Sequence, residues 1–155
     1  MIATSCYSSC NPKDSNFNYY SISGDRGKGV GYTGKYYRIL APKRSFWEIW
    51  HSNIGKIPTL SNDQFYIREY YKQVLLKLDP NEIYEKLDSP TTILLCYEPH
   101  NEFCHRHIVS AWIELMTDKL VPEIMQQRRN DLKNVSKPIW IKEYLENIIK
   151  SCKNI

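Results

Sequence analysis

The sequence lacks any long hydrophobic segment. Its longest apolar run covers residues 93–97, whereas a membrane-spanning helix needs about 20 such residues. The N-terminal segment MIATSCYSSC contains no basic stretch followed by an apolar one, so it does not have the pattern of a secretory signal peptide. We therefore expect a cytoplasmic protein that has no membrane partner.

Cysteine is also sparse, with five residues in a chain of 155. An odd number of cysteines without a secretory signal argues against a framework of disulfides, and reduced thiols are expected instead. Each cysteine is therefore expected to be a free thiol, available either for chemistry or for packing.

Glycine is the third scarce residue, and its distribution is uneven. Five of the six glycines lie between Gly24 and Gly34. A loop so rich in glycine needs unusual backbone dihedrals or a close approach of its backbone to a ligand. The spacing matches neither the dinucleotide-binding fingerprint nor the P-loop, so two interpretations stay open: a lid over a ligand and a plain surface hairpin.

The charge is modest and contains no dense basic run. The chain carries 21 basic and 17 acidic residues, which gives a net charge of +4. This balance fits attraction to a phosphate-bearing ligand, but it supports nucleic-acid binding only weakly. Twelve tyrosines and four tryptophans are a large aromatic content, which predicts a rich core or a surface that stacks on planar ligands.

The alternation of strand and helix patterns predicts an α/β fold. A chain of 155 residues can form one domain with a buried core. We expect a single compact three-layer domain in which helices flank a small, mainly parallel sheet. Residues 1–125 are expected to form the α/β domain, and residues 126–155 a polar linker and a C-terminal helix packed on the same domain.

Individual elements are best marked in the second half of the chain. Asp79 directly precedes Pro80, and this pair predicts a helix start with Asp79 as the N-cap. The apolar segment 91–97 predicts a central strand that is covered on both faces. A helix is expected over residues 104–118. Residues 121–124 predict an edge strand, where a proline is tolerated.

Groups with chemical potential gather after the 91–97 strand. The carboxyl end of a strand, followed by a helix start, is where α/β proteins place reactive or anion-binding groups. Two thiols, three imidazoles and one guanidinium lie close together there. They belong to Cys96, His100, Cys104, His105, Arg106 and His107.

The first interpretation of this segment is an anion site. The helix that begins near Cys104 directs unpaired backbone N–H groups toward the loop, and Arg106 can form paired hydrogen bonds with a phosphate. The glycine-rich loop would approach the ligand from the opposite side. The residues expected to bind it are Arg106, Cys96, Gly24, Arg26, Gly27 and Lys28. The alternative is a structural ion pair between Arg106 and Glu98 or Glu102.

The second interpretation is nucleophilic catalysis by Cys104. A thiol at a helix N-terminus beside His105 and Arg106 is expected to have a lowered pKa, which favours the thiolate. His105 would act as the acid or base, and Glu98 as an orienting group or general base. Cys96 is the less favoured nucleophile, with a small core residue as its alternative role. The cysteines and Arg106 do not have the Cys-x5-Arg spacing of a phosphatase loop.

The third interpretation, a zinc site, has less support. Its ligands would come from Cys96, His100, Cys104, His105 and His107, which lack the Cys-x2–4-Cys pairs usual in structural zinc sites. Cys6 and Cys10 could supply one such pair, which keeps this interpretation open. His105 and His107 point about 200° apart on a helix, so they cannot both face one ion. We therefore predict no metal ligands, and the sequence identifies no cofactor.

These motifs resemble a known family. LLCYE at residues 94–98, CHRHIV at 104–109 and VPEI at 121–124 are similar to blocks of the domain of unknown function 488 family of bacteria, archaea and phages. Further similar segments lie at residues 21–24, 37–43 and 76–80. The resemblance covers about residues 18–125 and implies a compact α/β fold with an unassigned activity.

The sequence thus favours a small-ligand enzyme or sensor. Its ligand would be a nucleotide-like or other phosphate-bearing molecule, held in a pocket of Cys, His and Arg side chains at the strand end. The alternative is a non-catalytic module that binds nucleic acid or protein through a basic, aromatic surface. Neither the substrate nor the type of reaction follows from the sequence.

Overall fold

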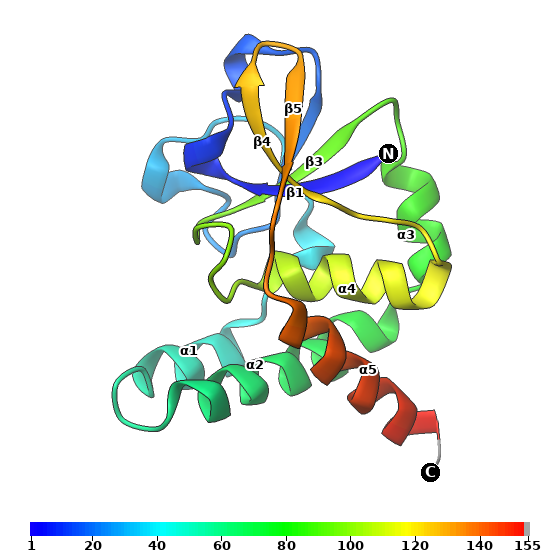
Figure 1. Cartoon of the computed structure of the whole chain (residues 1–155). Coiled ribbons are helices and arrows are strands. Elements are labelled where there is room, and N and C mark those ends of the chain that lie inside the picture. Colours follow the sequence, from blue (N-terminus) through cyan, green and yellow to red (C-terminus); the bar gives the residue numbers. More distant parts are fainter. Residues whose placement is uncertain (154–155) are drawn as a thin grey trace.

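The fold is built on one five-stranded sheet (Figure 1). The computed structural model describes residues 1–153. The strand order is β2-β3-β1-β4-β5. The strands are β1 (Ile2–Cys6), β2 (Asn18–Ser21), β3 (Thr92–Cys96), β4 (Glu123–Arg128) and β5 (Asp131–Val135). All neighbouring strands are parallel except β4 and β5, which are antiparallel. The predicted α/β fold with a mainly parallel sheet is therefore confirmed.

The middle of the sheet is fully buried. Every residue of β1 and of β3 is buried, as expected for parallel strands that are covered on both faces. The two strands pair in register, so that Cys6 lies beside Cys96 where both strands end. The strand predicted over residues 91–97 is thus confirmed as an inner strand.

The helices cover one face of this sheet (Figure 1). They are α1 (Arg44–Ser52), α2 (Thr59–Gln73), α3 (Pro80–Leu87), α4 (His105–Thr117) and α5 (Ile139–Lys153). Each contributes to the larger core cluster, which also contains Ile2 and Leu94 from the sheet. None of the helices described is long and apolar enough to cross a bilayer.

The other face of the sheet is covered by loops and short 3-10 turns. A smaller cluster there contains Ala3, Tyr19 and Ile93 from the strands. Tyr7 and Tyr32 pack against this cluster from the segments that follow β1 and β2. The sheet therefore lies between a layer of helices and a thinner layer of loops.

The region after α4 differs from the prediction. Residues 121–124 were expected at a sheet edge, but β4 lies between β1 and β5. Residues 126–137 were expected to be a linker, but they complete β4 and form β5, joined by a turn at residues 129–130. Most side chains of β5 are exposed, so the segment lacks the apolar alternation that marks a strand.

The start of α3 agrees with the sequence. Asp79 is the N-cap, and its carboxylate accepts hydrogen bonds from the backbone N–H groups of Asn81 at 2.9 Å and Glu82 at 3.4 Å. Pro80 follows in the first helical turn, where its missing N–H is not needed. This cap holds α3 in the connection between α2 and β3.

Replacing the cap should weaken the fold measurably. Asp79→Ala removes the acceptor for two backbone N–H groups and is expected to lower the free energy of unfolding by about 1 kcal/mol. Urea denaturation followed by circular dichroism measures the change. Glu85→Ala, at an exposed position of the same helix, is the control and should change stability far less.

Candidate functional site

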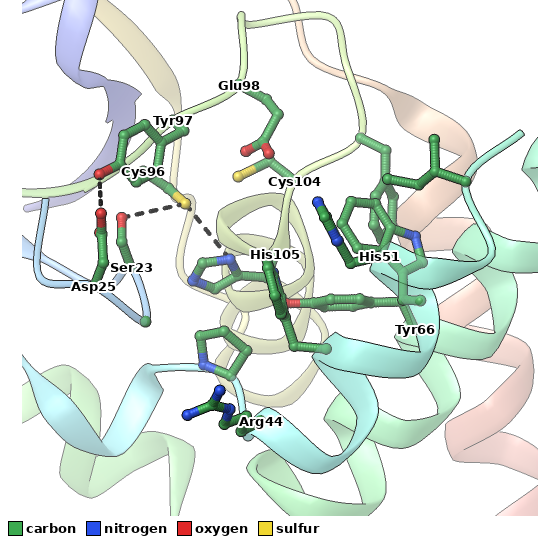
Figure 2. A pocket seen from close by; sticks show the side chains of 16 residues that line it. Ser23, Asp25, Arg44, His51, Tyr66, Cys96, Tyr97, Glu98, Cys104 and His105 are labelled. Carbon is green, nitrogen blue, oxygen red and sulfur yellow. Dashed lines mark hydrogen bonds between the residues drawn. The ribbon is translucent and has the colours of Figure 1, made fainter. Parts of the chain in front are cut away.

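A cavity of about 690 Å³ lies at the carboxyl end of β3 (Figure 2). Strand ends of this kind are the usual ligand sites of α/β sheets. The lining residues come from the loop after β2, from α1 and the segments next to it, from α2, and from the stretch between the last residue of β3 and the first residue of α4. They are Ser23, Gly24, Asp25, Pro42, Arg44, Trp47, Trp50, His51, Ile54, Tyr66, Cys96, Tyr97, Glu98, Phe103, Cys104 and His105.

Two thiols and one imidazole meet at the inner end of this cavity. One ligand atom each of Cys96, Cys104 and His105 lies within 4.8 Å of the other two. Cys96 ends β3, Cys104 is the N-cap of α4, and His105 is the first residue of that helix. All three are buried, with 3%, 2% and 6% of their surface exposed. The structure therefore brings together three residues that the sequence analysis selected.

The imidazole of His105 has a defined orientation. Its Nε2 lies 2.7 Å from the backbone carbonyl oxygen of Ile22. A carbonyl can only accept, so Nε2 carries a proton, and in the neutral ring Nδ1 then presents a lone pair. That lone pair faces the Sγ of Cys96 at 3.5 Å. Ser23 donates its hydroxyl to the same sulfur at 3.6 Å (Figure 2). Cys96 and His105 can therefore exchange a proton or bind the same metal ion.

Cys104 does not have the lowered pKa that the sequence predicts. Burial raises the pKa of its thiol well above the usual value, and the neighbouring Cys96 raises it further. Arg106 acts in the opposite direction but does not overcome these effects. As a free group, Cys104 is therefore a protonated thiol at neutral pH and a poor nucleophile.

Glu98 lies where it was expected, just beyond the end of β3. Its half-buried side chain lines the same cavity as the Cys96, Cys104 and His105 side chains. A carboxylate in this position can accept or donate a proton to a ligand in the cavity.

The glycine-rich loop is held by hydrogen bonds to two residues that line the cavity, Asp25 and Tyr97. The carboxylate of Asp25 accepts hydrogen bonds from the backbone of Gly27 at 2.8 Å and Gly29 at 3.0 Å, and from the Tyr97 hydroxyl. Gly27 has φ +80°, and a Cβ there would lie 2.8 Å from the Tyr7 hydroxyl. Only glycine fits this position without strain.

A second cavity of about 620 Å³ adjoins the first and shares Ser23, Gly24 and Pro42 with it. Four cationic side chains line it, and no acidic side chain does. These cations are Arg26, Arg38, Lys43 and Lys77. All four are exposed, and none makes a salt bridge within residues 1–153.

The predicted ligand-binding residues of the glycine-rich loop therefore lie in different places: some line a cavity and others do not. Gly24 lines both cavities and Arg26 lines the second one. Arg26 has φ +62°, uncommon for a residue with a side chain, and its guanidinium lies over the Tyr36 ring at 4.3 Å. Gly27 is buried as part of the loop's own structure, and Lys28 lines neither cavity.

Arg106 is directed away from both cavities. Its guanidinium is fully buried and forms an ion pair with Glu123 of β4, with Nη2 2.8 Å from Oε2 and Nε 3.1 Å from Oε1. The predicted partners of a structural ion pair were Glu98 and Glu102, in the segment between β3 and α4. The partner in the structure is instead Glu123, which lies in β4. Burial alone would raise the pKa of Glu123, yet the contact with Arg106 holds it below the usual value.

Further polar groups complete the environment of Glu123. Thr4 donates its hydroxyl to Oε1 at 2.6 Å, and His100 Nδ1 lies 2.6 Å from Oε2. The other ring nitrogen of His100 lies 2.8 Å from the Ser9 hydroxyl. His107 is also buried, and desolvation together with Arg106 lowers its pKa to about 3. His100 and His107 thus belong to the packing around Arg106, not to the cavity lining.

Aromatic side chains form one wall of the first cavity. The rings of Tyr66, Trp50 and Phe103 pack against one another. The Tyr66 centroid lies 5.3 Å from that of Trp50 and 5.4 Å from that of Phe103, and the latter two are 6.0 Å apart. Trp47 stacks on His51 at 4.7 Å and is 39% exposed. The sequence marks Trp47 and Trp50 only by their spacing on one helix, and gives no signal that Tyr66 and Phe103 join them.

Removal of the buried guanidinium should unfold the protein more easily. Arg106→Ala leaves the Glu123 carboxylate buried without its guanidinium partner and is expected to cost about 3–5 kcal/mol of stability. Urea denaturation measures this loss. Arg129→Ala, which breaks an exposed ion pair with Asp14 at 3.7 Å, is the matched control and should cost at most about 1 kcal/mol. Equal stabilities of the two variants would contradict the structural role of Arg106.

Comparison with known proteins agrees with the motifs. Residues 16–117 match the family model described as "DUF488-N3a: Active DUF488-N3 subclade". The matched range contains all of the residues that line the first cavity. Searches of curated proteins and of solved structures found no match. The resemblance drawn from the LLCYE and CHR blocks is confirmed, and the chain belongs to the DUF488-N3a family, the active DUF488-N3 subclade.

Proposed function

We propose that this protein is an enzyme that acts on a nucleotide-like, phosphate-bearing small molecule. The observation that carries the proposal is the pair of adjoining cavities with a shared wall of Ser23, Gly24 and Pro42. One cavity has an aromatic wall and contains the cluster of Cys96, Cys104 and His105. The other has only cationic charged side chains. A ligand that spans both needs a planar apolar part and an anionic part.

The charge of the second cavity favours a phosphate. Four cations in a cavity that no acidic side chain lines create a local positive potential, which raises the concentration of anions there. Arg26 and Arg38 can each form paired hydrogen bonds with phosphate oxygens. Arg26 thus keeps the anion-binding role predicted for it, and Arg38 takes the role predicted for Arg106 and Lys28.

The first cavity supplies the reactive groups. A base that stacks on Trp47 or Trp50 would lie beside the cluster of Cys96, Cys104 and His105, which we propose as the reactive centre. Glu98 is the group that we propose to accept and return a proton, since its carboxylate lines the cavity without being part of the cluster. The name of the matched subclade, which includes the word active, is in keeping with catalysis.

The alternative is a binding module for single-stranded nucleic acid. Exposed cations next to an exposed tryptophan are also what such modules use, through phosphate contacts and base stacking. In that case the Cys96, Cys104 and His105 cluster would only pack the end of β3. Retention on an oligonucleotide column that falls steeply with salt, together with no binding of mononucleotides, would favour this alternative.

Mononucleotide binding tests the proposal directly. The fluorescence of Trp47 and Trp50 should change on titration with nucleoside monophosphates and diphosphates, and less with the nucleosides. Arg38→Ala should weaken the nucleotide affinity about tenfold or more, because one charge-assisted hydrogen bond contributes about 1.5–3 kcal/mol. Lys56→Ala, at an exposed position outside both cavities, should leave the affinity unchanged. Equal binding of nucleoside and nucleotide would contradict the assignment of the second cavity.

Glu98→Gln separates binding from turnover. If Glu98 transfers a proton, the variant should bind the nucleotide normally but turn it over about 10²–10⁴-fold more slowly. Chromatography of nucleotide mixtures incubated with the protein measures the products. Unchanged turnover by Glu98→Gln would remove this residue from the mechanism.

A further inference from the structure

The geometry points to a zinc site formed by Cys96, Cys104 and His105, with its fourth coordination position directed into the first cavity. This inference rests on the proposed function, because it assigns a cofactor to the proposed reactive centre. From the sequence alone no metal ligands are predicted, because Cys96, Cys104 and His105 do not have the spacing of a zinc-binding motif. The fold creates the site by placing the end of β3 against the start of α4.

The distances suit a single ion. The three donor atoms lie within 4.8 Å of one another, and Sγ of Cys96 is 3.5 Å from Nδ1 of His105. Zinc binds sulfur at about 2.3 Å and nitrogen at about 2.1 Å, so two such ligands at a tetrahedral angle lie about 3.6 Å apart. The observed separation therefore already has the length of one edge of the coordination tetrahedron.

The surroundings of the donor atoms also match a metal centre. Histidine ligands of metals usually donate their second ring N–H to a carboxylate or a backbone carbonyl, which fixes the ring. His105 does this through Nε2 to the carbonyl of Ile22 at 2.7 Å. Ser23 donates a hydrogen bond to the Cys96 sulfur, which stabilises a coordinating thiolate.

The donor set selects the kind of metal. Two thiolates and one imidazole favour zinc, whereas magnesium and calcium prefer oxygen ligands. Three protein ligands beside a cavity are the arrangement of catalytic zinc sites, in which water or a substrate atom takes the fourth position. Structural zinc sites instead have four protein ligands. Glu98 lines the same cavity and is available for proton transfer.

Cobalt provides a spectroscopic test of the site. The reduced, chelator-treated full-length protein is titrated with Co²⁺, which gives thiolate charge-transfer absorption only when cysteine binds it. One equivalent should saturate the signal, and Zn²⁺ should displace the cobalt. Cys96→Ser and Cys104→Ser should each weaken metal binding more than about 100-fold. Loss of a group that only hydrogen-bonds to a metal ligand typically weakens it by about 10–100-fold. Cys152→Ser, at an exposed cysteine, is the control and should bind normally.

A second measurement protects the test against misfolded variants. In the unmodified chain, one equivalent of Zn²⁺ should slow maleimide labelling of Cys96 and Cys104, read by mass spectrometry of peptides, and leave Cys152 unaffected. Absence of a thiolate–cobalt signal together with absence of zinc protection overturns the inference. A full cobalt signal in well-folded Cys96→Ser and Cys104→Ser variants overturns it as well.

The test of the zinc site can fail or succeed independently of the test of the proposed function. Nucleotide binding is measured by tryptophan fluorescence on the metal-free protein, and metal binding by cobalt absorption without nucleotide. Nucleotide binding without metal binding overturns only the zinc site. Metal binding without any nucleotide binding supports the zinc site and overturns the proposed ligand.

Discussion

The buried ion pair between Arg106 and Glu123 is the interaction on which the geometry of the site depends. It joins the first turn of α4 to the start of β4, and the hydroxyl of Thr4 adds a contact from β1. A charge pair without solvent exposure tolerates little displacement, because each buried charge loses its oppositely charged partner when the other moves. The start of α4 is therefore held at a fixed position over the sheet, and Cys104 and His105 are held with it.

Neighbouring residues in this helix start have separate roles because a helix turns about 100° per residue. His105 faces the cavity and the Cys96 sulfur, whereas Arg106 faces β4. His107 is directed into a buried environment where burial and Arg106 keep it neutral. A cluster that is dense in sequence thus becomes two distinct environments in space. One contains the Cys96, Cys104 and His105 side chains at the end of β3, and the other contains the ion pair of Arg106 with Glu123.

The sequence was sufficient for features that depend on local patterns, and insufficient for those that depend on contacts between distant segments. The buried strand before Cys96, the helix start after Cys104 and the cap at Asp79 each have a local pattern, and the structure has all three. The pairing of Arg106 with Glu123, the exposed strand β5, and the meeting of Arg38 with Lys77 in one cavity have none. The prediction of a lowered pKa for Cys104 was wrong, because it took account of the position at the helix start but not of burial. Burial has the larger effect on this thiol and raises its pKa.

The close packing of Gly27 against Tyr7 has a consequence for how this site can change. The Tyr7 hydroxyl lies 2.7 Å from that of Ser23, and Ser23 in turn donates to the Cys96 sulfur. A side chain at position 27 would displace Tyr7 and, through Ser23, disturb the sulfur itself. The glycine loop and the cysteine are thus mechanically coupled through a chain of hydroxyl groups. The contacts that link Tyr7 through Ser23 to Cys96 at the end of β3 therefore restrict which residues the loop can have at position 27.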